Sequence, residues 1–172
     1  IGTFSLVSLS RTNSFFDLEK LYWFNKEYMR SLPVDRLLSY LEVPDTFMER
    51  IAVLRENAIS LKEMNEYLNI FHSAEINDQA KAFLCRTSIP DRLLESIADM
   101  YVDDRRPSIE DAVHNLAEAY HLKKKDIFML LRILITGRTN GPPLTALAGL
   151  VPIDVITERL KIVAESRDRA ER

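Results

Sequence analysis

Basic side chains gather in the sequence around one strongly apolar segment. Three lysines precede this segment, an arginine lies inside it, and a second arginine follows it, just before a loop fixed by glycines and prolines. Such cations bind RNA phosphates, and an arginine plane beside a rigid loop can hold an unstacked base. The alternative is a solvated lysine face beside an ordinary turn. The residues concerned are Lys123, Lys124, Lys125, Arg132, Arg138, Gly141, Pro142, Pro143 and Leu144.

The residue patterns that carry catalysis or hold a cofactor do not occur in this sequence. Its four glycines form neither a Walker motif nor G-x-G-x-x-G, so a phosphate cradle is not expected. His72, His114 and His121 each lack a second ligand at the spacing that zinc sites use, and the single Cys85 has no such partner either, which argues against zinc. We therefore expect no catalytic residue, no metal ligand and no cofactor within this chain.

The composition is that of a water-soluble globular protein. Hydrophobic residues make up 47% and charged residues 28%, which places the chain outside the disordered and membrane classes. The longest apolar run is broken by Arg132 and is too short to span a membrane. A formal net charge of −3 argues against a uniformly basic coat for nucleic acid. With one cysteine and no internal disulfide, we expect a reducing compartment, the cytoplasm. We also expect a monomer without DNA or membrane partners.

Helical periodicity predicts an all-α fold. Residues 1–16 have no such period and form an irregular leading segment, and the absence of an initiator methionine there suggests a piece of a longer protein. A charged turn is expected at 103–107 and a charged tail at 166–172. Helices are expected over residues 17–30, 33–41, 45–57, 60–71, 79–85, 91–102, 108–120, 126–135 and 152–163.

Capping signals mark several of these helix ends. Asp17, Ser60 and Ser108 have the side-chain oxygens that N-caps use, and Glu63 completes a capping box with Ser60. Gly137 is expected to end the apolar helix, because glycine adopts the left-handed backbone of a C-cap without steric cost.

Apolar spacing predicts which side chains face the core. The first helix is expected to bury a stripe that includes Leu18 and Tyr22, the third helix Met48, and the fifth Cys85. Arg132 lies in a helix that is apolar on nearly every side, so it must find a partner or point into a cleft.

Several sequence motifs resemble those of one enzyme family. Residues 16–30, FDLEKLYWFNKEYMR, are similar to the F-D-x-x-K-L-x-W-x-N-x-x-Y-I-R stretch of bacterial glutamyl-tRNA synthetases. Residues 131–137, LRILITG, and 141–144, GPPL, are similar to that family's L-R-x-x-L-T-G and G-P-x-L. Residues 60–63, SLKE, resemble its T-L-K-E, and residues 158–160, ERL, match its end. The likeness is collinear over nearly the whole chain.

The resemblance implies the part of a glutamate–tRNA ligase that follows its catalytic domain. The whole ligase joins glutamate to tRNA(Glu) with ATP and Mg, and the motifs that handle ATP are absent here, so this chain should be inactive alone. The implied organisation is the end of a stem-contact region at 1–32, followed by anticodon-binding helical subdomains at 33–88 and 89–172. The alternative is a helical protein-interaction scaffold that binds no RNA.

The same resemblance implies roles for individual residues. Arg132 matches the arginine that contacts the middle anticodon base, and Gly141, Pro142, Pro143 and Leu144 match the loop against which anticodon bases pack. Trp23 lies on the stem-contact helix and could be purely core. The resemblance also implies tRNA stem contacts for Lys20, Asn25, Tyr28 and Arg30, while backbone contacts are expected from the charge and position of Lys123, Lys124, Lys125 and Arg138.

One position departs from the family pattern. Members that separate glutamate tRNA from glutamine tRNA often place an arginine four residues before the T-L-K-E leucine, and this chain has Asn57 there. Asparagine can hydrogen-bond a base edge but lacks the charged planar fork of arginine. Arg55 lies close by and could substitute, so both residues belong to the expected anticodon site, and tRNA(Gln) is a second expected partner.

Overall fold

The computed structural model describes residues 16–102 and 107–168, which contain helices and no strand. The predicted all-α fold is therefore confirmed for this part of the chain. Its helices are α1 (Leu18–Ser31), α2 (Val34–Leu41), α3 (Met48–Leu54), α4 (Leu61–Leu68), α5 (Asp78–Arg86), α6 (Asp91–Val102), α7 (Ile109–Tyr120), α8 (Lys124–Thr136), α9 (Leu144–Leu147) and α10 (Ile153–Asp168).

Helix positions follow the sequence patterns closely, with a few differences. The predicted helix over 60–71 ends as a 3-10 turn, Asn69–Phe71, and α10 continues to Asp168, into the predicted tail. The third predicted helix is divided into a 3-10 turn, Asp45–Phe47, and α3, because Phe47 adopts φ −89° and ψ 0° between them. The short helix α9 was not predicted, since the prolines and glycines before it indicated only a loop. Most of the leading segment, the turn at 103–106 and the end of the tail lie outside the described residues.

Side-chain caps hold the helix starts as predicted. The Asp17 carboxylate accepts hydrogen bonds from the backbone N–H groups of Glu19 and Lys20, at 3.0 and 3.1 Å. Ser60 Oγ accepts from Glu63 N at 3.1 Å, but the Glu63 carboxylate accepts from Ile59 N, not from Ser60 N, at 2.7 Å. Ser60 therefore caps the helix as predicted, while the second hydrogen bond of the capping box comes from the residue before it, Ile59.

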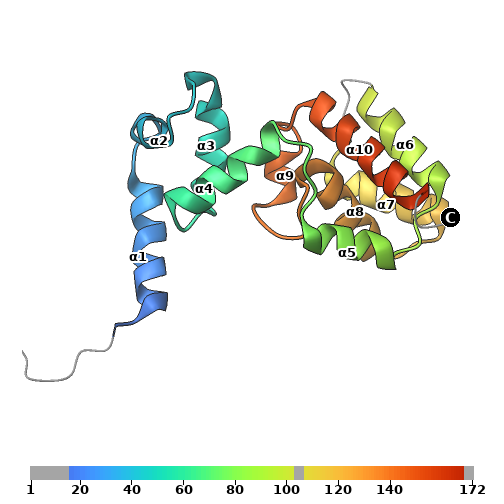
Figure 1. The fold of residues 1–172 in the computed structure, drawn as a ribbon, viewed down its shortest axis with the longest axis horizontal. Coiled ribbons are helices and arrows are strands. Elements are labelled where there is room, and N and C mark those ends of the chain that lie inside the picture. The colour runs from blue at the N-terminus through green and yellow to red at the C-terminus, as the bar shows by residue number, and fades with distance from the viewer. Residues whose placement is uncertain (1–15, 103–106, 169–172) are drawn as a thin grey trace, which may run out of the picture.

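The helices form two groups that are joined through the end of α4 (Figure 1). Helices α1 to α4 make the group on the left, and α5 to α10 make the group on the right. In the right-hand group α10 packs on α6 and α8, and α7 packs on α8. The figure places α5 with the right-hand group, while the predicted subdomain boundary at residues 88 and 89 stays a prediction.

Helix α8 forms the centre of the right-hand group. Every residue from Leu130 to Thr136 is buried, including the polar Arg132 and Thr136, in a helix that was predicted to be apolar on nearly every side. A buried leucine or isoleucine side chain stabilises a fold by about 1.5–3 kcal/mol. Because α8 is packed on nearly all sides, the loop that leaves its C-terminus starts from a fixed point.

The apolar stripe predicted for α1 is exposed over most of its length. Met29 is its buried residue, whereas Leu18 is 54%, Tyr22 49% and Trp23 58% exposed. The prediction that this stripe lies in the core is wrong for the described chain. The reason is geometric, because α1 meets the other helices only through its second half, so its first turns have no described surface to pack on.

Met48 and Cys85 were also wrongly predicted to be buried. Met48 begins α3 directly after the 3-10 turn, where the helical phase shifts, and is 48% exposed. Cys85 is exposed because α5 buries Ala80 and Leu84, four residues apart, which turns the next residue away by about 100°.

Gly137 should be irreplaceable at the end of α8. Its φ is +72°, and a Cβ built there would lie 2.2 Å from the Glu75 carbonyl oxygen. Gly137→Ala is expected to lower the free energy of unfolding by at least about 1–3 kcal/mol, the usual cost of such backbone strain. Urea denaturation followed by circular dichroism measures the change.

Gly149→Ala is the matched control, because a Cβ there meets nothing within 4 Å. It should change the unfolding free energy by less than about 0.5 kcal/mol. Equal stability of the two variants would contradict the role assigned to Gly137.

Candidate nucleic-acid interface

Arg132 is buried and fixes the loop that follows α8. The side chain is 9% exposed, and Arg132 Nη1 donates a hydrogen bond to the Pro142 carbonyl oxygen at 3.1 Å. Its guanidinium carbon lies 5.4 Å from the ring centre of Phe128. Burial lowers the pKa of Arg132. Arg132 was expected either to find a partner or to point into a cleft. In the structure it has a partner, the Pro142 carbonyl oxygen of the loop.

Thr136 and Gly137 set the direction in which this loop starts. Thr136 Oγ1 donates to the Arg132 carbonyl oxygen at 2.7 Å and accepts from Arg138 N at 3.1 Å. The Gly137 carbonyl oxygen accepts from Asn77 N at 2.9 Å, which ties the loop to the start of α5. The loop backbone is thus held at its beginning by α8 and α5.

The loop closes one side of a pocket that we call the loop pocket. Its volume is about 400 Å³, and α4 with the turn before it closes the other side. Three predicted site residues, Asn57, Arg138 and Gly141, line this pocket. Pro142 is the next residue after Gly141 in the loop. Arg132 is not among the lining residues, which are Asn57, Glu63, Glu66, Tyr67, Arg138, Asn140 and Gly141.

Tyr67 and Arg138 link the two sides of the loop pocket. Arg138 Nη2 donates to the Glu66 carbonyl oxygen at 2.9 Å, and its guanidinium carbon lies 5.8 Å from the Tyr67 ring centre. Tyr67 OH donates to Glu63 Oε1 at 2.8 Å. Burial, together with the hydrogen bond to Glu63 and its charge, raises the pKa of Tyr67 to about 12.

Asn57 and Arg55 face different surroundings although they lie in one turn. Asn57 lines the loop pocket. Arg55 Nη1 donates to the Leu32 carbonyl oxygen at 3.1 Å, at the end of α1, and Arg55 Nε lies 3.6 Å from a Glu56 carboxylate oxygen. Arg55 is therefore engaged with α1 and does not line the pocket beside Asn57.

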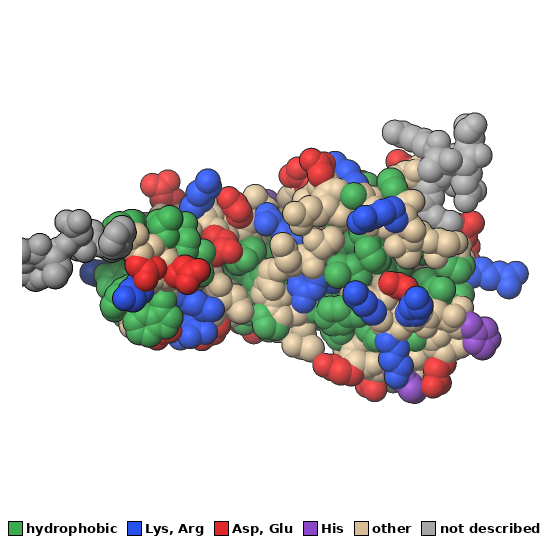
Figure 2. Space-filling model, turned by 90° about the horizontal axis from the view of Figure 1, so that it is seen from below, with side chains coloured by type: hydrophobic (Ala, Val, Ile, Leu, Met, Phe, Trp, Pro, Cys, Tyr) green, Lys and Arg blue, Asp and Glu red, His purple; other side chains and the backbone are tan. Residues whose placement is uncertain are grey.

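The lysine run lies at the opposite end of α8 from the loop. Lys123, Lys124 and Lys125 are exposed around the first turn of the thirteen-residue helix, whereas Arg138 and the loop follow its last turn. Lys124 Nζ contacts His114 Nδ1 at 3.0 Å. The structure therefore does not bring the lysines together with the loop pocket, although Lys and Arg side chains are spread over the right-hand helices on one face (Figure 2).

Two of the motif residues on α1 hold the helix in place. Asn25 Nδ2 donates to the Ile59 carbonyl oxygen, and Arg30 Nη2 donates to the Glu56 carbonyl oxygen at 2.9 Å. Arg30 Nη1 also pairs with Glu27 at 3.1 Å. Lys20, Trp23, Tyr28 and Arg30 are exposed, so these motif residues on α1 are accessible to a stem.

Arg159 is a structural residue that sequence reasoning missed. It is 1% exposed, and its guanidinium donates to carbonyl oxygens of Ile70, Ser73, Leu134 and Ile135. Burial and, second, the charge of Arg138 lower the pKa of Arg159 to about 10. The sequence signal for this residue was its place in the family's closing motif. The helical pattern alone did not show whether Arg159 is buried or exposed.

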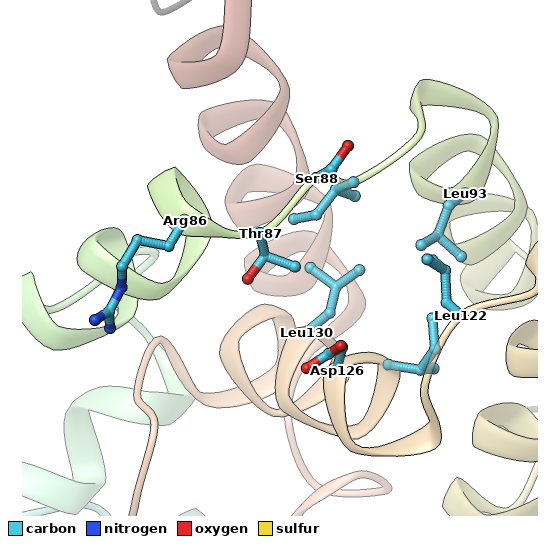
Figure 3. Close-up of a pocket in the computed structure, with 9 residues that line it drawn as sticks. Arg86, Thr87, Ser88, Leu93, Leu122, Asp126 and Leu130 are labelled. Atoms are coloured by element: carbon cyan, nitrogen blue, oxygen red, sulfur yellow. The ribbon is translucent and has the colours of Figure 1, made fainter.

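A separate cavity of about 370 Å³ lies between the α5–α6 connection and the start of α8 (Figure 3). Thr87, Leu130 and Asp126 converge on it, whereas the Arg86 side chain points away. The predicted site residues do not line it. In the described ranges no group of three or more potential metal ligands occurs, and no helix there is long and apolar enough to cross a membrane.

Arg159→Ala should destabilise the protein strongly. It would leave buried carbonyl oxygens after α4 and at the end of α8 without this donor, and each buried polar group left without a partner costs about 1–3 kcal/mol. Chemical denaturation of the purified variant tests this. Lys161→Ala, an exposed change on the same helix, should cost under about 1 kcal/mol, and a similar loss in both variants would contradict the assignment.

Tyr67 should lose its proton late in an alkaline titration. The folded pKa of about 12 lies above the ordinary 10.0, so this group adds stability below pH 10 and loses that contribution as the pH rises through 12. The ¹³Cζ chemical shift of labelled tyrosine follows the ionisation. Glu63→Gln should lower the Tyr67 pKa, because it removes a negative charge, and an unchanged midpoint would contradict the contact.

Solved structures share this fold. A glutamate tRNA ligase from Elizabethkingia meningosepticum superposes with a TM-score of 0.67 and 21% identity, covering 94% of this chain and 35% of its own. The glutamate-tRNA synthetase from Elizabethkingia anophelis gives a TM-score of 0.62 with 23% identity, covering 94% of this chain and 34% of its own. At these identities the likeness shows the fold.

Curated relatives give the same picture at the level of sequence. The glutamate–tRNA ligase of Mycoplasmopsis pulmonis is 27% identical in an alignment of 168 residues that covers 94% of this chain and 35% of that protein. Glutamate–tRNA ligase 1 of Syntrophus aciditrophicus is 35% identical in an alignment of 161 residues that covers 84% of this chain and 34% of that protein. The chain thus spans about a third of the length of these relatives.

A family model provides the assignment. The model described as an anticodon binding domain matches residues 17–164, and this range includes α1, the loop pocket and most of α10. Because the match covers most of the sequence, the chain belongs to the anticodon-binding-domain family.

Proposed function

We propose that this chain is the anticodon-binding part of a glutamate–tRNA ligase and binds the anticodon arm of tRNA(Glu). The collinear likeness to glutamate–tRNA ligases over 94% of the chain supports this proposal. Joining glutamate to the tRNA, with ATP and Mg, belongs to the remainder of the parent enzyme. The chain acts by selecting the RNA, as a monomer in the cytoplasm.

One observation carries the proposal, which is the rigid loop held by Arg132 opposite α4. Arg132 fixes the Pro142 carbonyl, so the backbone that faces an incoming base is positioned before the RNA arrives. Binding then loses little conformational entropy in the protein, which favours tight and selective recognition. In this role Arg132 supports anticodon reading through the loop, and the exposed Pro143 offers a face for base packing.

The remaining predicted contacts form an outer set of phosphate ligands. Lys20 and Tyr28 are exposed on α1, and Lys123, Lys124 and Lys125 are exposed at the start of α8. These side chains bind the tRNA backbone and supply salt-dependent affinity. Because Asn57 lines the pocket where an arginine would supply a charged fork, we also propose that tRNA(Gln) is bound.

Arg132→Ala should weaken binding of tRNA(Glu) by about 1–3 kcal/mol, the size expected for a residue on which one base contact depends. The loss arises because the loop is no longer held by its guanidinium donor. Fluorescence anisotropy with labelled tRNA(Glu), at several salt concentrations, measures the affinity. The wild-type affinity should fall as salt rises.

Arg36→Ala on α2 is the control, because this exposed arginine lies outside the loop pocket. It should leave the affinity within about twofold, corresponding to under about 0.5 kcal/mol. Equal wild-type affinity for tRNA(Glu) and for a tRNA with an unrelated anticodon would contradict anticodon recognition. Absence of RNA binding would favour a helical interaction scaffold instead.

A further inference from the structure

The loop pocket is assembled from two distant parts of the chain. Asn57 and Tyr67 come from α4 and the turn before it, and Arg138 and Gly141 come from the loop after α8. A ligand in this pocket therefore touches both helical groups at once. Its chemistry can be inferred from the charges and ring surfaces that line it.

Arg138 brings a cation whose hydrogen-bonding capacity is only partly used. Among the hydrogen bonds of the described residues, its guanidinium uses Nη2 alone, for the Glu66 carbonyl oxygen. A guanidinium carries five N–H donors in one plane. The described ion pairs do not include Arg138. Donors on this side chain thus remain for a ligand.

Tyr67 supplies a fixed aromatic ring beside that cation. Its hydroxyl is held by Glu63, so the ring cannot turn freely. Gly141 leaves the neighbouring space open, since a Cβ there would come within 3.5 Å of Tyr67 Cε1. A planar ligand can approach the ring where another residue would add a side chain.

The charges of the pocket select against a phosphate and against a cation. Glu63 and Glu66 both line it, so a phosphate beside Arg138 would also face two carboxylates. A metal ion or an amine would be attracted by the two carboxylates but would also face the guanidinium, so neither a cation nor an anion suits all the lining groups. A neutral planar group with both hydrogen-bond acceptors and N–H donors satisfies arginine, glutamate and asparagine together. Nucleobases have this chemistry, and RNA is read through such unstacked bases.

Under the proposed function the loop pocket receives one unpaired anticodon base, and we infer that Arg138 is the residue that reads the edge of this base. This inference rests on the proposed function and changes the role of Arg138 from a phosphate contact to a specificity residue. Arg138 donates to acceptor atoms of the base, the Glu66 carboxylate accepts from its N–H groups, and Tyr67 provides an aromatic surface. Asn57 can donate or accept through its amide.

The experiment uses the full chain and labelled anticodon stem-loops of tRNA(Glu). Each of the three anticodon bases is replaced in turn by the other bases and by an abasic site, and dissociation constants are measured by anisotropy. The wild type should prefer the native base at one position, or at several. Arg138→Gln should remove this preference at one position only, with a loss of roughly 5- to 150-fold for the native loop.

Arg138→Lys separates base reading from simple charge. Lysine keeps the positive charge but lacks the planar fork, so the salt dependence should persist while the preference at that one position is lost. At the same position, Arg138→Gln and the abasic loop should not be additive, because both remove the same contact. Arg36→Gln should leave all preferences unchanged, and Lys125→Gln should weaken all loops equally. Denaturation curves confirm that each variant is folded.

The outcomes are distinct. A wild type that discriminates at no anticodon position contradicts the proposed function itself. A wild type that discriminates, with Arg138→Gln showing the same preferences, overturns the inference and leaves the proposed function intact. An equal loss for every loop, with a salt slope reduced by about one, would make Arg138 a phosphate ligand and also overturn it. Abasic loops on the wild-type protein show which anticodon bases contribute to affinity, and non-additivity with Arg138→Gln assigns one of them to the loop pocket.

Discussion

The buried guanidinium of Arg159 joins the two helical groups. It donates to carbonyl oxygens of Ile70 and Ser73, just after α4, and of Leu134 and Ile135, at the end of α8. A buried charge with several backbone acceptors is stable only while all of them stay in place. This one side chain therefore fixes the last turn of α8 relative to the end of α4. The two walls of the loop pocket begin at those points.

Backbone geometry carries this arrangement from α8 into the loop. The left-handed Gly137 turns the chain beside the Glu75 carbonyl, where a side chain would collide. Arg132 then donates a hydrogen bond to the Pro142 carbonyl oxygen, and Arg138 donates one to the Glu66 carbonyl oxygen on α4. The three arginines have different roles. The buried Arg132 and Arg159 fix the backbone around the site, whereas the half-buried Arg138 has hydrogen-bond donors left for a ligand.

Local signals predicted most of the fold, because caps, prolines and helical periods act within a few residues. The positions of α6 and α8, the N-caps at Asp17 and Ser60 and the end at Gly137 all follow from such signals. The exposure of α1 could not be predicted in this way, because an apolar stripe does not reveal whether another surface covers it. Tyr67 and Arg159 were missed for a related reason. Their roles depend on contacts across the chain, 71 residues apart for Tyr67 and Arg138, and a single helical pattern contains no such information.

The short turn between α3 and α4 has two occupied sides. On one side its carbonyls at Glu56 and Ile59 accept hydrogen bonds from Arg30 and Asn25 of α1. On the other side Asn57, between those two residues, lines the loop pocket. Residues 56–59 thus both hold α1 through their carbonyl oxygens and form part of the pocket wall. Both the support of α1 and this part of the pocket wall therefore depend on the conformation of one backbone segment.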